Sequence, residues 1–161
     1  MSENEIETIS KDMFVNVKEE VREKPTLKHI IQATIVDEPK IRHNPINGKG
    51  ETTKEKRKFI KYYFTLHFLL DQPLEVNGVK YEELYESYGF RVYSDNKSVW
   101  WGGDKSSCAQ TIDKLKAYTP DLNENPSVTK VLEAFADRKV KIISKKFGPN
   151  DSIKTMIDTF V

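Results

Sequence analysis

The sequence has very little cysteine: among its 161 residues only Cys108 carries a thiol. A disulfide within the chain is therefore impossible, and a zinc site built on several thiolates is excluded. No apolar run approaches the length of about 18 residues that a membrane-spanning helix needs. The segment MSENEIETISKD also lacks the basic-then-apolar pattern of a signal peptide. We therefore expect a soluble, non-secreted protein of a reducing compartment such as the cytoplasm, without membrane contact.

An overall excess of charge is also missing, because the net charge is only +1. The charged residues are unevenly distributed along the chain. Residues 1–23 hold seven acids and three bases, whereas residues 40–61 hold eight bases and two acids. The length suits one domain. We expect an acidic, partly flexible N-terminal arm at 1–24, where neither helix nor strand is favoured, followed by a single domain at 25–161.

Motifs of catalysis and metal binding are absent from the sequence. His29, His43 and His67 are far apart and show no H-x-H or H-E-x-x-H spacing. Neither a P-loop nor a dinucleotide-binding glycine motif is present. Cys108 lies at a predicted helix start, where a thiol can become acidic, but a small buried residue is the commoner case. We expect a protein that is not an enzyme and holds no cofactor or metal.

The most informative pattern lies in KRKFIKYYFTLHFLL, residues 56–70. The even positions carry Ile60, Tyr62, Phe64, Leu66, Phe68 and Leu70. The odd positions carry Phe59, Lys61, Tyr63, Thr65 and His67. The even face is typical of a strand that covers a core, because successive side chains point to opposite sides. The odd face carries aromatic rings and cations where a solvated face usually carries small polar residues.

Further elements follow from turn and cap signals. Strands are predicted at 27–36 and 59–70, joined by a long mobile loop, and again at 139–147 and 152–161. Segment 71–88 is predicted to hold a Pro turn, an Asn-Gly turn at 77–78 and a short helix-like piece. Helices are predicted after caps at Ser106 or Ser107 and at Ser127. This order predicts a mainly β fold: an OB-like five-stranded barrel with a helical insertion between strands 3 and 4.

The segment GFRVYSDNKSVWWGG predicts a hairpin that turns at residues 95–96. A two-residue turn pairs Tyr93 with Ser98, Val92 with Val99, Arg91 with Trp100, and Phe90 with Trp101. Cross-strand partners share a face, so this hairpin repeats the division into an apolar face and an aromatic-plus-cation face. A slip of one residue exchanges Trp100 for Trp101, and we favour Trp100 on the outer face.

Rings beside cations on an open sheet suit single-stranded nucleic acid, because bases stack on rings while Lys and Arg contact phosphates. The residues expected to bind are Phe59, Lys61, Tyr63, His67, Arg91, Tyr93 and Trp100 on the strands, with Arg42, Lys54, Lys56, Arg57 and Lys58 from the basic segment. Two alternatives stay open. In the first, the rings are ordinary strand formers and lie covered by a helix or by the N-terminal arm. In the second, the basic segment is a solvated linker without a binding role.

In this layout the chain resembles the small OB-fold single-stranded DNA-binding proteins of phages, viruses and plasmids. The resemblance rests on FIKYYFTLHF, GFRVYSDNKSVWW, RKVKIISKKFG and the basic loop, and it covers residues 25–161. It implies sequence-independent coating of single-stranded DNA in replication, recombination or repair, with proteins of those processes as possible partners. Other function classes remain: a protein-interaction module that uses the same face, an RNA-binding protein, or a metal-dependent nuclease.

Overall fold

The structure is a computed structural model that describes residues 24–43, 48–122 and 126–161. The expected N-terminal arm lies almost wholly outside these residues. The strands are β1 (Ile31–Ile35), β2 (Ile41–His43), β3 (Lys49–Glu51), β4 (Lys58–Val76), β5 (Val79–Tyr93), β6 (Val99–Trp100), β7 (Lys139–Phe147) and β8 (Ser152–Phe160), and the helices are α2 (Ser107–Tyr118) and α3 (Val128–Phe135). Ser106 and Ser127 cap the helices, accepting hydrogen bonds from the backbone N–H groups of Ala109 and Lys130.

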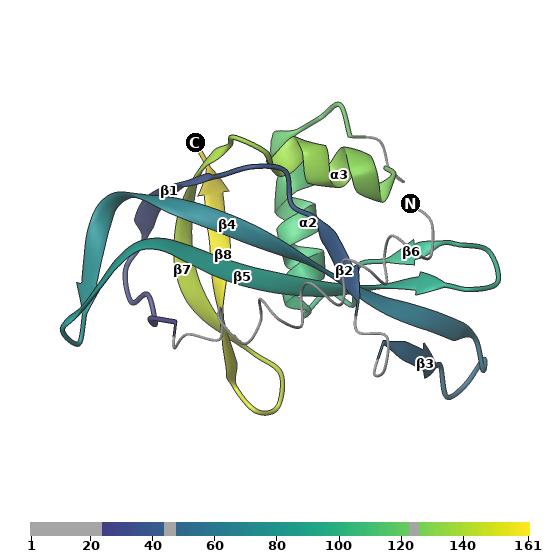
Figure 1. The fold of residues 1–161 in the computed structure, drawn as a ribbon. Coiled ribbons are helices and arrows are strands. Elements are labelled where there is room, and N and C mark those ends of the chain that lie inside the picture. The colour runs from purple at the N-terminus through teal and green to yellow at the C-terminus, as the bar shows by residue number, and fades with distance from the viewer. Residues whose placement is uncertain (1–23, 44–47, 123–125) are drawn as a thin grey trace.

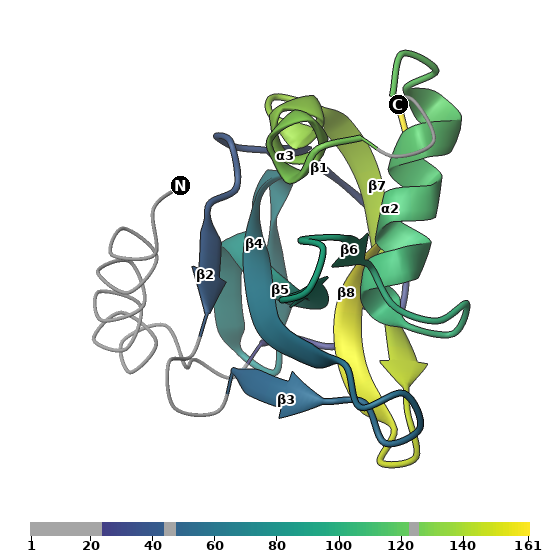
Figure 2. The ribbon, with the colours of Figure 1, turned by 90° about the vertical axis from the view of Figure 1, so that its right-hand side faces the viewer.

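The fold is mainly β, with the strands in one antiparallel sheet that curls into a half-barrel (Figures 1 and 2). The strand order is β6-β5-β4-β1-β7-β8. The short strands β2 and β3 also pair with β4, along the same edge as β1. Neither the expected count of five strands nor the expected place of the helices is confirmed. The described residues form eight strands, because β2, β3 and β6 add to the sheet, and the helices lie between β6 and β7.

The longest feature is the β4–β5 hairpin, which crosses the whole molecule in Figure 1. Its turn is Asn77-Gly78, and both residues have positive φ (51° and 79°), as a two-residue turn of this twist requires. The predicted Pro turn and the helix-like piece before residue 88 are both wrong. Pro73 sits within β4 at a register shift, and β5 is extended because pairing with β4 overrides local helix propensity.

The segment 37–58, expected as one loop, holds β2 and β3. Ile41 pairs with Phe64 and Gly50 with Phe59, so both short strands are fixed to β4. The first predicted strand is shorter than expected and spans only the residues of β1.

The core fills the inside of the curl. It joins the even face of β4 to the inner faces of β1, β5, β7 and β8, and to one side of each helix. Phe64, Phe68, Phe135, Leu115 and Ile142 are fully buried there. In Figure 2, α2 runs beside β8 and α3 lies at one end of the curl. Neither of these two described helices is long and apolar enough to cross a membrane.

Hydrogen bonds that involve side chains join β5 to β8, which do not pair with each other in the sheet. The Tyr88 hydroxyl donates to the carbonyl oxygen of Thr155 at 2.5 Å, and Lys154 Nζ donates to the carbonyl oxygen of Ser87 at 2.5 Å. The Thr155 N–H donates in return to Glu86 Oε1 at 2.7 Å. These bonds hold β5 in place and fix its outer face.

Candidate nucleic-acid interface

The odd residues of β4 and their partners on β5 and β6 form one outer face. Phe59 pairs with Tyr93, Lys61 with Arg91, and Arg91 with Trp100. We call Phe59, Lys61, Tyr63, Arg91, Tyr93 and Trp100 the aromatic–cation face. The predicted hairpin register is confirmed, and so is the orientation of the two tryptophans. Trp100 is 41% exposed, whereas the Trp101 ring packs inward at 4.9 Å from the Phe90 ring.

Arg91 occupies the centre of the face, between two rings. Its guanidinium carbon lies 4.1 Å from the centroid of Phe59 and 4.7 Å from that of Trp100. Lys61 Nζ lies 5.4 Å from the centroid of Tyr63. These cation–π contacts fix the directions of rings and cations before any ligand arrives.

Arg57 is held at the edge of the face by two contacts. Its guanidinium lies 3.9 Å from the Tyr93 centroid and donates two hydrogen bonds, at 2.9 and 3.0 Å, to the Asp95 carboxylate. The hydrogen bonding from Arg57 lowers the pKa of Asp95, so this pair persists at neutral pH. Arg57 therefore orients Tyr93 and is less available to a phosphate than an unpaired cation.

Two glycines allow the rings to lie flat, and sequence reasoning missed both. A Cβ on Gly50 would lie 2.4 Å from Phe59 Cζ, and one on Gly89 would lie 3.2 Å from Tyr63 Cε1. Each ring therefore lies on bare backbone of the neighbouring strand. An isolated glycine within a strand pattern is the signal that could have found Gly89.

A hollow of about 170 Å³ adjoins the centre of the face. It is lined by Lys61, Gly89, Phe90, Arg91, Trp100, Gly102, Gly103 and Ser106. Two cations and one exposed ring thus border an open space, a combination that suits a phosphate next to a stacked base.

The other predicted residues lie around this face. Arg42 pairs with Tyr63 across β2 and β4, which brings it to the same side. Lys54 and Lys56 are exposed in the turn before β4, and Lys58 is exposed but alternates to the other side of β4 from Phe59.

His67 lies further along β4, away from the cations. Its ring stacks on Tyr85 with centroids 4.3 Å apart, and its Nε2 is 2.9 Å from Glu83 Oε2. The carboxylate makes this end of the face less favourable for phosphate than the end at Lys61.

Cys108 is only 1% exposed, and burial raises the pKa of its thiol to about 12. A thiol that stays protonated at neutral pH is a poor nucleophile, so no covalent chemistry is assigned to it. Among the described residues, no group of three or more His, Cys, Asp or Glu side chains is placed to hold a metal ion.

The Cys108 thiol is expected to make stability fall with rising pH. The ordinary pKa of 9.0 applies to the unfolded chain, so between pH 9 and 12 the unfolded state releases a proton that the folded state keeps. Raising the pH from 8 to 10 should therefore lower the free energy of unfolding by about 1 kcal/mol through this group. Urea unfolding of Cys108→Ala at both pH values should show a smaller fall; equal falls would contradict the assignment.

No protein-family model matches the chain, and a search of curated proteins finds no match.

Proposed function

We propose that this protein binds single-stranded DNA without base preference and catalyses no reaction. The observation that carries the proposal is the position of Arg91, stacked between Phe59 and Trp100 on an outer face that the described residues leave open. Rings at this spacing offer stacking surfaces, and the neighbouring cations offer phosphate contacts. Bases of a duplex are hidden within the stack, so a flat face of rings suits single strands.

The binding mode uses each part of the face differently. Trp100 and Tyr63 stack on bases, and Phe59 and Tyr93 support the platform from the edge where Gly50 and Arg57 hold them. Lys61 and Arg91 take phosphates at the hollow between them. Arg42 and Lys56 extend the positive border of the face. Stacking accepts any base, because each base has a π-face.

We further propose that the half-barrel is of the OB type. Support comes from the connectivity: β1 pairs with both β4 and β7, β4 pairs with β5, and β7 pairs with β8. The side-chain bonds between β5 and β8 lie where a closed barrel would have its last seam. OB folds bind oligonucleotides on the face that corresponds here to β4 and β5. A role in replication, recombination or repair follows from this class of binding, with RNA as the other candidate strand.

The rings also suit a different kind of ligand, a protein chain, because Tyr, Trp and Arg are common anchors of protein interfaces. The salt dependence of the binding affinity distinguishes a nucleic-acid ligand from a protein ligand. Each phosphate neutralised by a cation contributes about −0.7 to the slope of log affinity against log salt for single strands. Four such contacts give a slope of about −3, or a loss of about 50-fold over a fourfold rise in salt.

We expect titration with unlabelled poly-dT to quench tryptophan fluorescence, because Trp100 is exposed and stacks on a base. The binding constant should fall steeply between 50 and 200 mM salt, by about 50-fold. Oligo-dA and oligo-U, read in the same way, test base preference and DNA against RNA. The matching duplex is the control and should bind far more weakly. Absence of quenching and of binding at low salt would remove the single-strand proposal and favour a protein ligand.

A further inference from the structure

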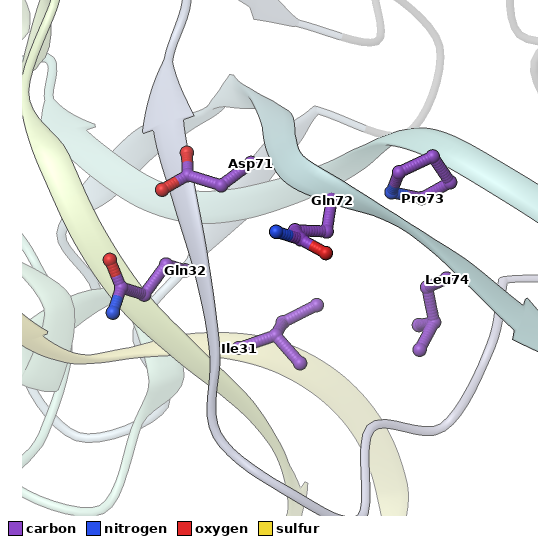
Figure 3. A pocket seen from close by; sticks show the side chains of 6 residues that line it. All are labelled: Ile31, Gln32, Asp71, Gln72, Pro73 and Leu74. Carbon is purple, nitrogen blue, oxygen red and sulfur yellow. The ribbon is translucent and has the colours of Figure 1, made fainter.

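A second hollow lies at the opposite end of the long hairpin from the aromatic–cation face. It has a volume of about 370 Å³ and is lined by Ile31, Gln32, Asp71, Gln72, Pro73 and Leu74 (Figure 3). It forms because β1 pairs with β4 only as far as Leu70, and because the register between β4 and β5 shifts between Leu69 and Leu74. The strands separate at that point, and side chains of both line the space between them.

The lining suits the side chain of a lysine. Ile31, Pro73 and Leu74 provide apolar surface for a four-carbon stem, and the Asp71 carboxylate provides the counter-charge for an ammonium. In Figure 3 the polar ends of Asp71 and Gln32 lie on one side of the hollow, and Pro73 and Leu74 lie on the other. A side chain with an apolar stem and a cationic tip can pack its stem on the apolar side of the hollow and place its charge next to the polar side.

The surroundings of this hollow are acidic and partly apolar. Residues 71–83, which we call the acidic end, hold four acids and one base. Leu69, which precedes this segment in β4, and Val79 within it are 47% and 50% exposed. An incoming partner therefore needs positive charge and some apolar surface.

The complementary surface lies at the other end of the same hairpin. Residues 54–58 and 94–97, which we call the basic end, lie next to the aromatic–cation face and outside it, and they hold five bases and two acids. Lys54 is exposed in the turn that leads into β4. About twelve residues of strand separate the two ends, a distance of about 40 Å, so the ends of one molecule do not meet. One copy can therefore present its basic end to a neighbour and its acidic end to another.

We infer that the hollow receives Lys54 of a second copy of this chain when two copies lie next to each other on one strand. This inference rests on the proposed function. The contact joins unlike surfaces head to tail, and such contacts continue into open chains when the rotation does not close a ring. Exposed ion pairs are weak alone, so copies should associate mainly where a strand holds them at high effective concentration.

The test compares two lengths of oligo-dT by fluorescence anisotropy: one that seats a single copy, fixed by stoichiometric titration, and one several times longer. Wild type should bind the long strand up to about fivefold more tightly per copy than the short one. The double variant Asp71→Lys, Glu75→Lys should lose this advantage while binding the short strand at least as well as wild type. Added positive charge alone predicts the opposite for the long strand, namely tighter binding.

The matched control is Asp113→Lys, Glu133→Lys, which makes the same change of charge on exposed positions of α2 and α3. It should keep the long-strand advantage. If wild type binds the short strand but shows no advantage on the long one, or if both double variants behave alike, the inference is wrong and the proposed function stands. If wild type binds neither strand at low salt, the proposed function fails and the inference fails with it.

Discussion

Replacing Trp100 by alanine is expected to weaken binding of a short oligo-dT by about 5- to 150-fold, equivalent to about 1–3 kcal/mol for one stacked base. Trp100 is the most exposed ring of the aromatic–cation face, at 41%. Its loss also removes one of the two rings that hold Arg91, whose guanidinium lies 4.7 Å from the Trp100 centroid. Stacking and phosphate contact are therefore both weakened by one substitution.

Two further variants separate these effects in anisotropy titrations at constant salt. Trp100→Phe keeps a π-face and should retain most of the affinity. Tyr118→Ala removes a ring that is 48% exposed on α2, away from the face, and should bind as wild type does. If Trp100→Ala binds within twofold of wild type while the salt dependence remains, phosphate contacts alone hold the strand and the rings are structural.

The parts of the fold that could be predicted from the sequence depend on local signals. The alternation of apolar and other residues along 59–70 predicted which side of β4 faces the core. The turn at residues 95–96 predicted the register that places Trp100 outside and Trp101 inside. Serine caps at 106 and 127 are similarly local, because each serine bonds to a backbone N–H three residues later.

Features that arise from distant pairing could not be predicted in this way. The extended form of residues 79–88 depends on pairing with β4, and the segment alone has a helix-like composition. Arg57 contacts Asp95 only because the turn before β4 and the turn after β5 lie side by side. Arg57 was predicted to bind a phosphate, but in the structure it forms an ion pair with Asp95. Glu86 gave a partial signal in the sequence. It alternates with Leu84 and Tyr88, so a β-strand here would place its carboxylate on the buried side, as the structure does.

That buried charge leads to the largest expected change in stability. Glu86 is 6% exposed, and its Oε1 accepts hydrogen bonds from the Thr155 N–H at 2.7 Å and from Lys24 Nζ at 2.5 Å. Lys154, close by, has a pKa lowered by burial, and the charge of Glu86 opposes that shift. The carboxylate thus joins β8 to β5 and compensates cations on both sides.

Glu86→Ala is expected to lower the free energy of unfolding by about 2–4 kcal/mol, measured by urea unfolding at pH 7. The buried Thr155 N–H loses its acceptor, and Lys154 stays partly buried without a counter-charge. Glu86→Gln is the matched control: it keeps an acceptor oxygen but not the charge, so its smaller loss measures the charge alone. A value for Glu86→Ala within 0.5 kcal/mol of wild type would show that β5 and β8 are held by packing, and that the outer face needs no such bond to keep its shape.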